Sequence, residues 1–148
     1  MPLTIRPYRR LHCAILASVK RLLLITLLLL SNGPVYAEWV LVSGNDQTGV
    51  AVYLDPDTIR RKGDIVRMLI LDDYKTVRTV EGISYFSAKR ETLFDCAEER
   101  TRLLAFAEFS GNMGNGEVVY GNSDGDRWIP VESDSINKRL WEVACAKK

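Results

Sequence analysis

Apolar and polar residues alternate over most of the chain after residue 38, and this alternation predicts a series of short β-strands. The run at 65–71 is apolar on both faces, which places it at the centre of a sheet. Asn115-Gly116 is a strong hairpin signal between the last two long strands. The predicted strands are 39–43, 49–54, 65–71, 84–92, 100–109, 117–120 and a short stretch at 128–129.

The hydrophobic period changes after residue 133 from that of a strand to that of a helix. Residues 133–135 are typical N-cap residues, and Ile136, Leu140 and Val143 recur at helical spacing, with Ala144 as a neighbouring alternative to Val143. We expect this helix to bury Ile136, Leu140 and Val143 against one face of the sheet. The predicted fold is α+β: a single antiparallel sheet of about six strands in a meander, with a C-terminal helix packed on one face.

Residues 1–37 have the pattern of a secretory signal peptide. They contain five basic residues and no acidic ones, followed by an apolar run at 22–30 and a small-residue cleavage site before Glu38. The apolar run is shorter than the roughly 20 residues that span a bilayer, although an uncleaved anchor is the alternative. We therefore expect an exported chain whose single domain is 38–148.

The charge of the mature domain argues against nucleic-acid binding. Without the five basic residues of 1–37, 15 of the 20 basic residues remain against 19 acidic ones, which leaves a net charge of −4. The chain's one histidine, His12, lies in the signal segment, so the mature domain has no histidine for a catalytic triad or a metal site. We expect a non-enzymatic protein without a cofactor or a bound metal.

Two cysteines remain in the mature domain, Cys96 and Cys145. An even number of cysteines in an exported chain is typical of a disulfide, because that compartment is oxidising. The bond would close a loop of about 50 residues and contribute roughly 4 kcal/mol in the chain-entropy description.

Five basic residues are candidates for a binding surface: Arg60, Arg61 and Lys62 in a turn, and Lys89 and Arg90 on a half-exposed strand. They could attract an acidic or sulfated macromolecule, and the alternative is ordinary charged surface. The tryptophans are expected in the core rather than in a ligand site, with part of the third exposed; they are Trp39, Trp128 and Trp141.

Several motifs have weaker chemical interpretations. Asn122-x-Asp124-x-Asp126 matches the start of a calcium loop, but Arg127 stands where such a loop needs glycine, so a polar turn is favoured. The glycines at 111, 114 and 116 lie between two strands and favour a hairpin over a phosphate loop. The adjacent carboxylates at 72–73 and 98–99 point to opposite faces of a strand, and we expect them to be solvated.

A set of motifs runs in a fixed order through the mature domain: Trp39, Tyr53-Leu54-Asp55, Thr58-Ile59, Gly63, Asp73-Tyr74, Ser87, Asp95-Cys96, Arg100, Trp128, Pro130, Ser133, Leu140 and Cys145. This order resembles the surface-adhesin protein E family of Gram-negative bacteria. The resemblance implies an antiparallel sheet with a C-terminal helix attached by a disulfide, and binding of host plasma or matrix proteins without catalysis. It also implies that the exported chain is in the periplasm or on the outer surface of a Gram-negative bacterium.

Together these features predict an exported binding module whose partner is a matrix protein or an envelope component. Two alternatives remain open. One is a periplasmic carrier that holds an apolar ligand between helix and sheet, and the other is an accessory subunit in envelope assembly.

Overall fold

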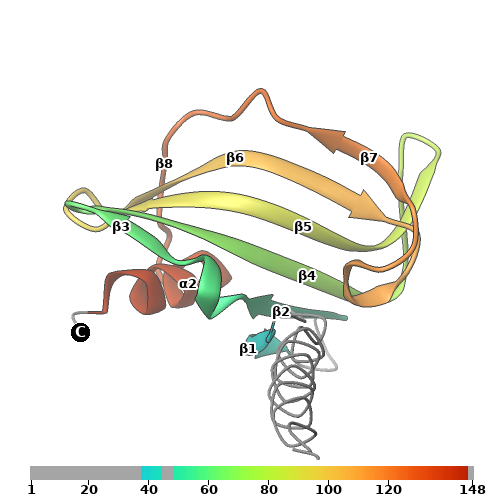
Figure 1. The fold of residues 1–148 in the computed structure, drawn as a ribbon, viewed down its shortest axis with the longest axis horizontal. Coiled ribbons are helices and arrows are strands. Elements are labelled where there is room, and N and C mark those ends of the chain that lie inside the picture. Colours follow the sequence, from blue (N-terminus) through green and yellow to red (C-terminus); the bar gives the residue numbers. More distant parts are fainter. Residues whose placement is uncertain (1–37, 45–48, 147–148) are drawn as a thin grey trace, which may run out of the picture. The chain divides into compact units, whose positions relative to one another are not determined.

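The computed structural model describes residues 38–44 and 49–146, so the predicted signal segment 1–37 lies outside the described residues. The described part is one antiparallel sheet with a single α-helix at its C-terminal end, which confirms the predicted fold class (Figure 1). Within these ranges, no helix is long and apolar enough to cross a membrane.

Six strands lie side by side in the order β1-β2-β4-β5-β6-β7, and two short strands add to the sheet. β3 pairs with the beginning of β4, and β8 pairs with the beginning of β6. The strands are β1 (Val40–Gly44), β2 (Val50–Leu54), β3 (Arg60–Lys62), β4 (Ile65–Val80), β5 (Ile83–Asp95), β6 (Arg100–Phe109), β7 (Val118–Asn122) and β8 (Ile129–Pro130), with 3-10 turns η1 (Pro56–Thr58) and η2 (Asn112–Gly114).

The β4–β5 hairpin is longer than the sequence pattern predicts. The apolar pattern predicts a strand that ends at Leu71, whereas β4 continues to Val80. Its second half is exposed from Lys75 onward, so it carries no hydrophobic alternation that would reveal a strand. The hairpin turns at Glu81 and Gly82, whose φ values of 50° and 83° are those of a tight turn between twisted strands.

Helix α2 (Ile136–Cys145) begins at Ser135, whose Oγ accepts a hydrogen bond from the Lys138 amide at 3.0 Å. The helix buries Leu140 and Ala144 completely or nearly so. The prediction that Val143 is buried is wrong, since 44% of it is exposed. The turn of the helix directs Ala144 to the sheet instead, because Ala144 lies four residues after Leu140.

The core lies between α2 and the face of the sheet that carries Val66, Met68 and Ile70, which we call the helix face. Phe94 of β5 and Val52 of β2 complete this core. The predicted disulfide is present: Cys96 in the turn after β5 is bonded to Cys145 at the end of α2, with their Cα atoms 5.5 Å apart.

The opposite face of the sheet carries Ile65, Arg67 and Leu69, and we call it the open face. Among the described residues no α-helix packs on it. The turn η2 covers part of it, at the end far from β3, where the Gly114 amide donates to Ser87 Oγ at 2.8 Å. The sheet therefore presents one packed face and one largely uncovered face.

Candidate binding surfaces

A row of arginines crosses the open face at its β3 end. Arg60 of β3 and Arg67 of β4 are direct cross-strand partners, so their side chains rise side by side. The row continues through Leu93 of β5 to Arg102 of β6. Like charges directly opposite one another destabilise a strand pair. The pairing of Arg60 with Arg67 is therefore not explained by the stability of the sheet.

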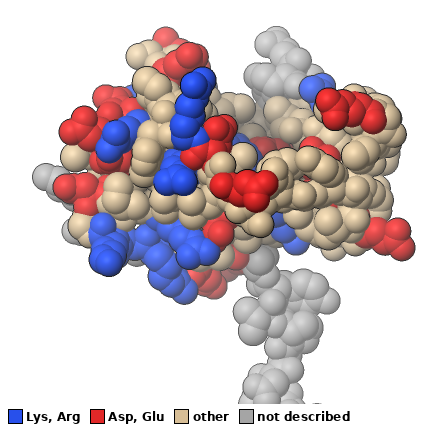
Figure 2. All heavy atoms as spheres, turned by 90° about the horizontal axis from the view of Figure 1, so that it is seen from above, with Lys and Arg blue, Asp and Glu red and all other residues tan. Residues whose placement is uncertain are grey.

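The charge of Arg60 is not neutralised by any described carboxylate. Its guanidinium donates to the carbonyls of Asp57 and Ile59 at 2.7 and 2.9 Å, which holds the side chain without cancelling its charge. Arg67 donates from Nε to Glu91 Oε1 at 2.6 Å, in a pair that is largely exposed. Figure 2 shows Lys and Arg side chains gathered, with some acidic ones, at the end of the domain where Figure 1 places β3.

The prediction of a basic turn at residues 60–62 is wrong, since they form strand β3 paired with β4. The other two basic residues of this strand, Arg61 and Lys62, therefore lie on opposite faces. Lys62 pairs with Ile65 and is exposed on the open face beside Arg60. Arg61 pairs with Val66 on the helix face, and its Nη2 donates to the Ala144 carbonyl at 2.7 Å. The Ala144 carbonyl is one of the last in α2 and has no partner within the helix, so this cation satisfies it and offsets the negative end of the helix dipole. Arg61 is therefore a structural residue.

The predicted candidates Lys89 and Arg90 are separated from the β3 turn and from each other. Lys89 lies on the open face under η2, where its Nζ donates to the Gly114 carbonyl at 3.1 Å and stands 4.8 Å from the ring centroid of Phe109. Arg90 lies on the helix face as the partner of Ile70. Of the five predicted residues, only Arg60 and Lys62 share an exposed surface.

Arg90 is held by Asp72, a residue that we expected to be solvated. That expectation is wrong: Asp72 is 9% exposed, and Arg90 donates to its two oxygens from Nε at 2.5 Å and from Nη2 at 3.0 Å. Neighbouring strand residues do point to opposite faces, but the face of Asp72 is the covered one. A half-buried guanidinium supplies the charge that makes this burial possible.

A groove of about 340 Å³ opens beside this ion pair, between the sheet and the first turn of α2. Its surface is mainly apolar, and Val50, Val52, Tyr74 and Ile136 are among the residues that line it. Further along α2 the contact is closed, since Leu140 is fully buried. The groove therefore lies at the N-terminal end of α2.

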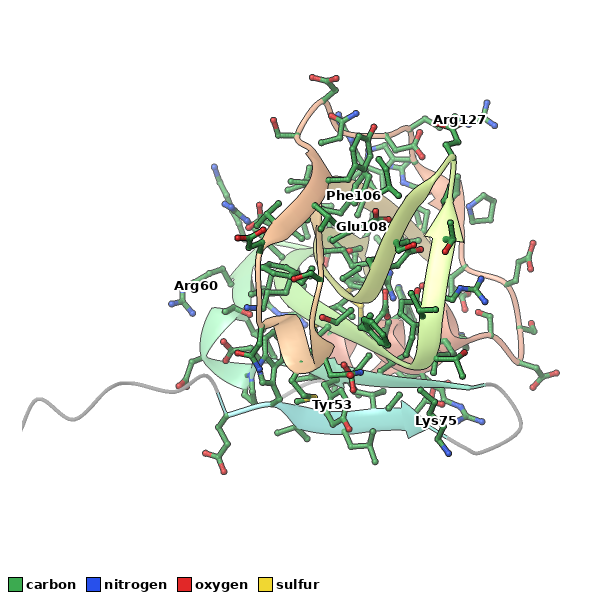
Figure 3. All side chains as sticks on the ribbon, turned by 90° about the vertical axis from the view of Figure 1, so that its right-hand side faces the viewer. Tyr53, Arg60, Lys75, Phe106, Glu108 and Arg127 are labelled. Atoms are coloured by element: carbon green, nitrogen blue, oxygen red, sulfur yellow. A yellow bond between two sulfur atoms is a disulfide. The ribbon has the colours of Figure 1, made fainter. Side chains whose placement is uncertain are left out.

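A second group of side chains on the helix face lies beyond this groove, toward β7. Glu108 of β6 is the cross-strand partner of Tyr120, and Phe106 precedes it on the same face (Figure 3). The rings of Phe106 and Tyr120 are 5.7 Å apart, and the Tyr85 hydroxyl donates a hydrogen bond to the Glu108 carboxylate. We call Tyr85, Phe106, Glu108 and Tyr120 the aromatic–carboxylate cluster.

Burial alters the proton affinity of the groups on this face. It raises the pKa of Glu108, an effect that the hydrogen bond from Tyr85 only partly opposes. Burial and the negative charge of Asp72 raise the pKa of Tyr74 to about 12. The Tyr74 ring meets Tyr85 edge-on at 5.7 Å, so the groove and the aromatic–carboxylate cluster are adjacent.

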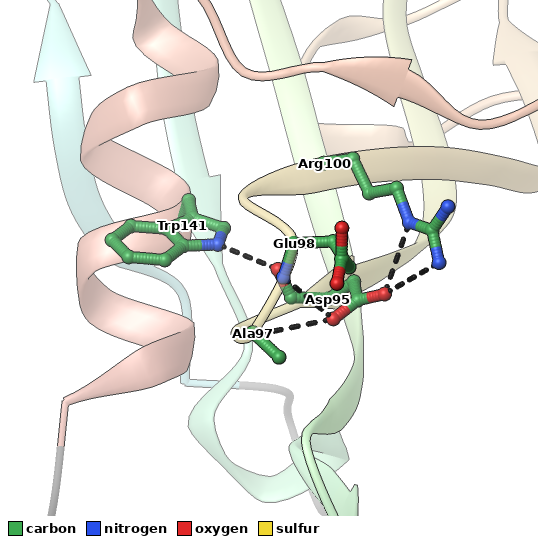
Figure 4. Close-up of polar contacts among 5 residues, drawn as sticks. All are labelled: Asp95, Ala97, Glu98, Arg100 and Trp141. Carbon is green, nitrogen blue, oxygen red and sulfur yellow. Dashed lines mark hydrogen bonds and ion pairs between the residues drawn. The ribbon is translucent and has the colours of Figure 1, made fainter.

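The turn after β5 is fixed by Asp95 (Figure 4). Burial raises the pKa of this carboxyl, but the Glu98 and Ala97 amides, each at 3.1 Å, and Arg100 Nε at 3.0 Å lower it below its ordinary value. The Asp95 carbonyl accepts a hydrogen bond from Trp141 Nε1 at 3.0 Å. This turn is thus tied to α2 by a hydrogen bond as well as by the disulfide.

The tryptophans are less buried than we expected. All three are partly exposed, and Trp141, which was predicted to be so, packs at the edge of the core. Trp128 lies under the guanidinium of Arg100, 5.0 Å from the ring centroid, outside the buried cluster.

The loop motifs are structural turns. Asn122 Oδ1 accepts a hydrogen bond from the Asp124 amide at 2.7 Å, and Asp126 Oδ1 accepts one from the amide of Arg127 at 2.7 Å, as in polar turns. In the ranges that the structure describes, no group of three or more histidine, cysteine or acidic residues could hold a metal ion. The glycines after β6 form the predicted connection to β7.

Sequence reasoning missed the groups that the sheet register assembles. Asp72, Glu108 and Tyr120 belong to one row across β4, β5, β6 and β7, yet they are up to 48 positions apart in the chain. The alternation within 100–109 did place Phe106 and Glu108 on one face, but no local signal shows that this face is concave or what lies opposite.

Comparison with known proteins identifies the fold and the family. The family described as Surface-adhesin protein E matches residues 39–146. Crystal form II of Haemophilus influenzae protein E superposes with a TM-score of 0.59 at 13% identity, covering 75% of this chain and 89% of that one. Another structure of Haemophilus influenzae protein E gives a TM-score of 0.57 at 13% identity, covering 75% and 86%. No curated relative matches the chain.

The likeness to the solved structures concerns the fold, while the family match covers nearly all of the described residues. The antiparallel sheet, the C-terminal helix and the joined cysteines agree with what the resemblance implied. The chain belongs to the surface-adhesin protein E family.

Proposed function

We propose that this protein is an exported, non-enzymatic binding module that contacts an acidic or sulfated macromolecule through the open face of its sheet. The partner is a matrix protein or an envelope component. Membership of a surface-adhesin family supports an exported protein that acts by binding. The proposed contact is made by Arg60, Lys62 and Arg67, which we call the basic row.

The observation that carries this proposal is the cross-strand pairing of Arg60 with Arg67 on the uncovered face. In a domain with a predicted net charge of −4, the charge of Arg60 creates a local positive field, to which Arg67 adds less because it is paired with Glu91. Lys62 extends this field along β3, and no α-helix among the described residues shields it. An anionic surface can approach these three side chains without rearrangement of the sheet.

Binding of the purified protein to immobilised heparin and to immobilised matrix proteins tests the proposal. Arg60→Gln should weaken binding about threefold, the effect of one exposed charge. Arg127→Gln is the matched control, because Arg127 is also exposed and Figure 3 shows it on the side away from Arg60. Higher salt should weaken binding of the unaltered protein. Equal losses in both variants would refute a localised site.

The groove at the first turn of α2 favours a second candidate function, that of a small-ligand carrier. Its volume of about 340 Å³ lies at the lower end of the range for ligand pockets, roughly 300–1,000 Å³. The packed contact at Leu140 limits such a ligand to the N-terminal end of the helix. Native mass spectrometry of the protein purified from envelope extract should reveal a bound small molecule if the carrier function is correct.

A further inference from the structure

We propose that the aromatic–carboxylate cluster on the helix face binds a lysine or arginine side chain of a partner polypeptide. This site is separate from the basic row, since Glu108 and Arg67 lie on opposite faces of the sheet. It therefore goes beyond the proposed function: the basic row binds an anionic partner, whereas this second site binds a cationic side chain.

Glu108 supplies the charge for such a site. Its carboxylate accepts a hydrogen bond from Tyr85, and no lysine or arginine among the described residues forms an ion pair with it. The nearby cation on its face, Arg90, is already engaged by both oxygens of Asp72. Glu108 is partly buried beside aromatic rings. Buried carboxylates are normally paired with a cation, and a lysine or arginine of a partner would supply that missing positive charge.

The rings beside Glu108 are suited to the same ligand. Phe106 and Tyr120 pack at a tilt of 54°, and aromatic faces attract ammonium and guanidinium groups within about 6 Å. The chain itself uses this interaction next to the site, where the Arg78 guanidinium stands 5.4 Å from the ring centroid of Tyr74. A carboxylate flanked by aromatic rings selects a cation that also has an apolar stem.

The position of the cluster at the margin of the sheet points to a polypeptide as the source of this cation. Tyr120 is 46% exposed and belongs to β7, the end strand of the sheet order. An end strand presents unpaired backbone groups to which an extended segment can add. Tyr120 and Glu108 are cross-strand partners, so a segment paired with β7 would place one helix-face side chain in their row, next to Tyr120. A long basic side chain at that position can extend over Tyr120 toward Glu108.

Two matched peptides test this inference: an acetylated, amidated pentapeptide of alternating valine and arginine, and the same peptide with glutamine in place of arginine. In an NMR titration of the whole protein, the arginine peptide should shift the resonances of Phe106, Glu108 and Tyr120. The glutamine peptide should bind about tenfold more weakly, which corresponds to the loss of one charge-assisted contact. Equal affinity for both peptides would overturn the proposal.

Glu108→Gln should weaken binding of the arginine peptide about tenfold, because it removes the charge and keeps the shape. Glu117→Gln is the matched control, since Glu117 is exposed just before β7, and it should leave the affinity within about twofold. Equal losses in the two variants would show a general charge effect and refute the site.

Tetramethylammonium chloride, titrated alone, distinguishes the source of the cation. If it shifts the same resonances and the arginine peptide binds no more tightly, a small cation rather than a polypeptide is the ligand, and the proposal is overturned. Arg60→Gln should not change the peptide affinity. The failure of this proposal can therefore be told apart from failure of the basic row.

Discussion

Single arginines in this sheet have roles that depend on the face from which they project. Arg90 compensates a buried carboxylate, Arg61 caps a helix, and Arg60 holds an uncompensated charge in solvent. In the sequence all three belong to short basic pairs or runs of similar appearance. Only the register of the strands separates the structural residues from the candidate for binding.

Replacing Arg90 should destabilise the protein far more than replacing Arg67. Arg90→Gln leaves Asp72 buried without its charged partner, and we expect a loss of about 3 kcal/mol in the free energy of unfolding. Arg67→Gln breaks a largely exposed pair and should cost less than about 1 kcal/mol. Urea unfolding of both variants measures the difference, and similar losses would contradict the assigned roles.

Glu108 should make the protein less stable at neutral pH than a neutral residue would. Burial raises its pKa in the folded state above the ordinary value of 4.5, so the folded protein binds this proton more tightly than the unfolded chain. Its contribution to stability therefore falls as pH rises from 4.5 through the raised pKa.

Glu108→Gln should consequently raise the melting temperature by a few degrees at pH 7. The advantage should disappear below pH 4.5, where both states of the unaltered protein are protonated at this residue. Thermal melts across this range test the sign, and a lower melting temperature of the variant at pH 7 would show that burial does not disfavour the charge.

At the scale of elements, the sequence predicts strands and caps that have a local pattern, and it misses exposed strand segments that have none. The apolar alternation of β4 identifies its buried half, Ile65–Leu71, whereas the exposed half to Val80 has no such pattern. The N-cap at Ser135 was predictable because the cap is a local hydrogen bond. The exposure of Val143 was not, since positions three and four residues after Leu140 both lie near its face of the helix, and only the packing on the sheet selects Ala144.

The turn after β5 should depend on the ionised form of Asp95. Its pKa is lowered by hydrogen bonds that exist only in the folded protein, so its stabilisation is fully present above about pH 4 and is lost as pH falls through the lowered value. Asp95→Asn should lower the melting temperature at pH 7, and this difference should shrink below the ordinary pKa of 3.8.

Asp126→Asn is the control for this prediction. Asp126 is exposed, and its carboxylate accepts a hydrogen bond from the amide of the next residue, Arg127. It should leave the melting temperature nearly unchanged at both pH values. A pH-independent loss in Asp95→Asn would indicate that shape rather than charge fixes the turn.

At the scale of the whole molecule, the domain consists of a curved sheet, a terminal helix and the bond that joins them. The sequence predicted this arrangement, because strand number, helix position and cysteine parity are all properties of the chain's order. It could not predict which side chains meet on the helix face. The aromatic–carboxylate cluster is created by register across several strands, and register follows from tertiary packing.

The disulfide should supply a large part of the stability of this small domain. The two cysteines are 49 positions apart, and removing the bond frees a loop whose closure is worth about 4 kcal/mol. Cys145→Ser should lower the urea midpoint accordingly and increase amide exchange at Leu140. Chemical reduction of the unaltered protein should reproduce both effects, and an unchanged midpoint would contradict the role given to the bond.

Binding of an anionic macromolecule to the β3 end of the open face is tested most directly by an NMR titration. The purified protein is titrated with a heparin oligosaccharide at low and high salt. We predict salt-sensitive shifts confined to the amides around Arg60, Lys62 and Arg67. Shifts centred on the helix face, or none at any salt concentration, would contradict it.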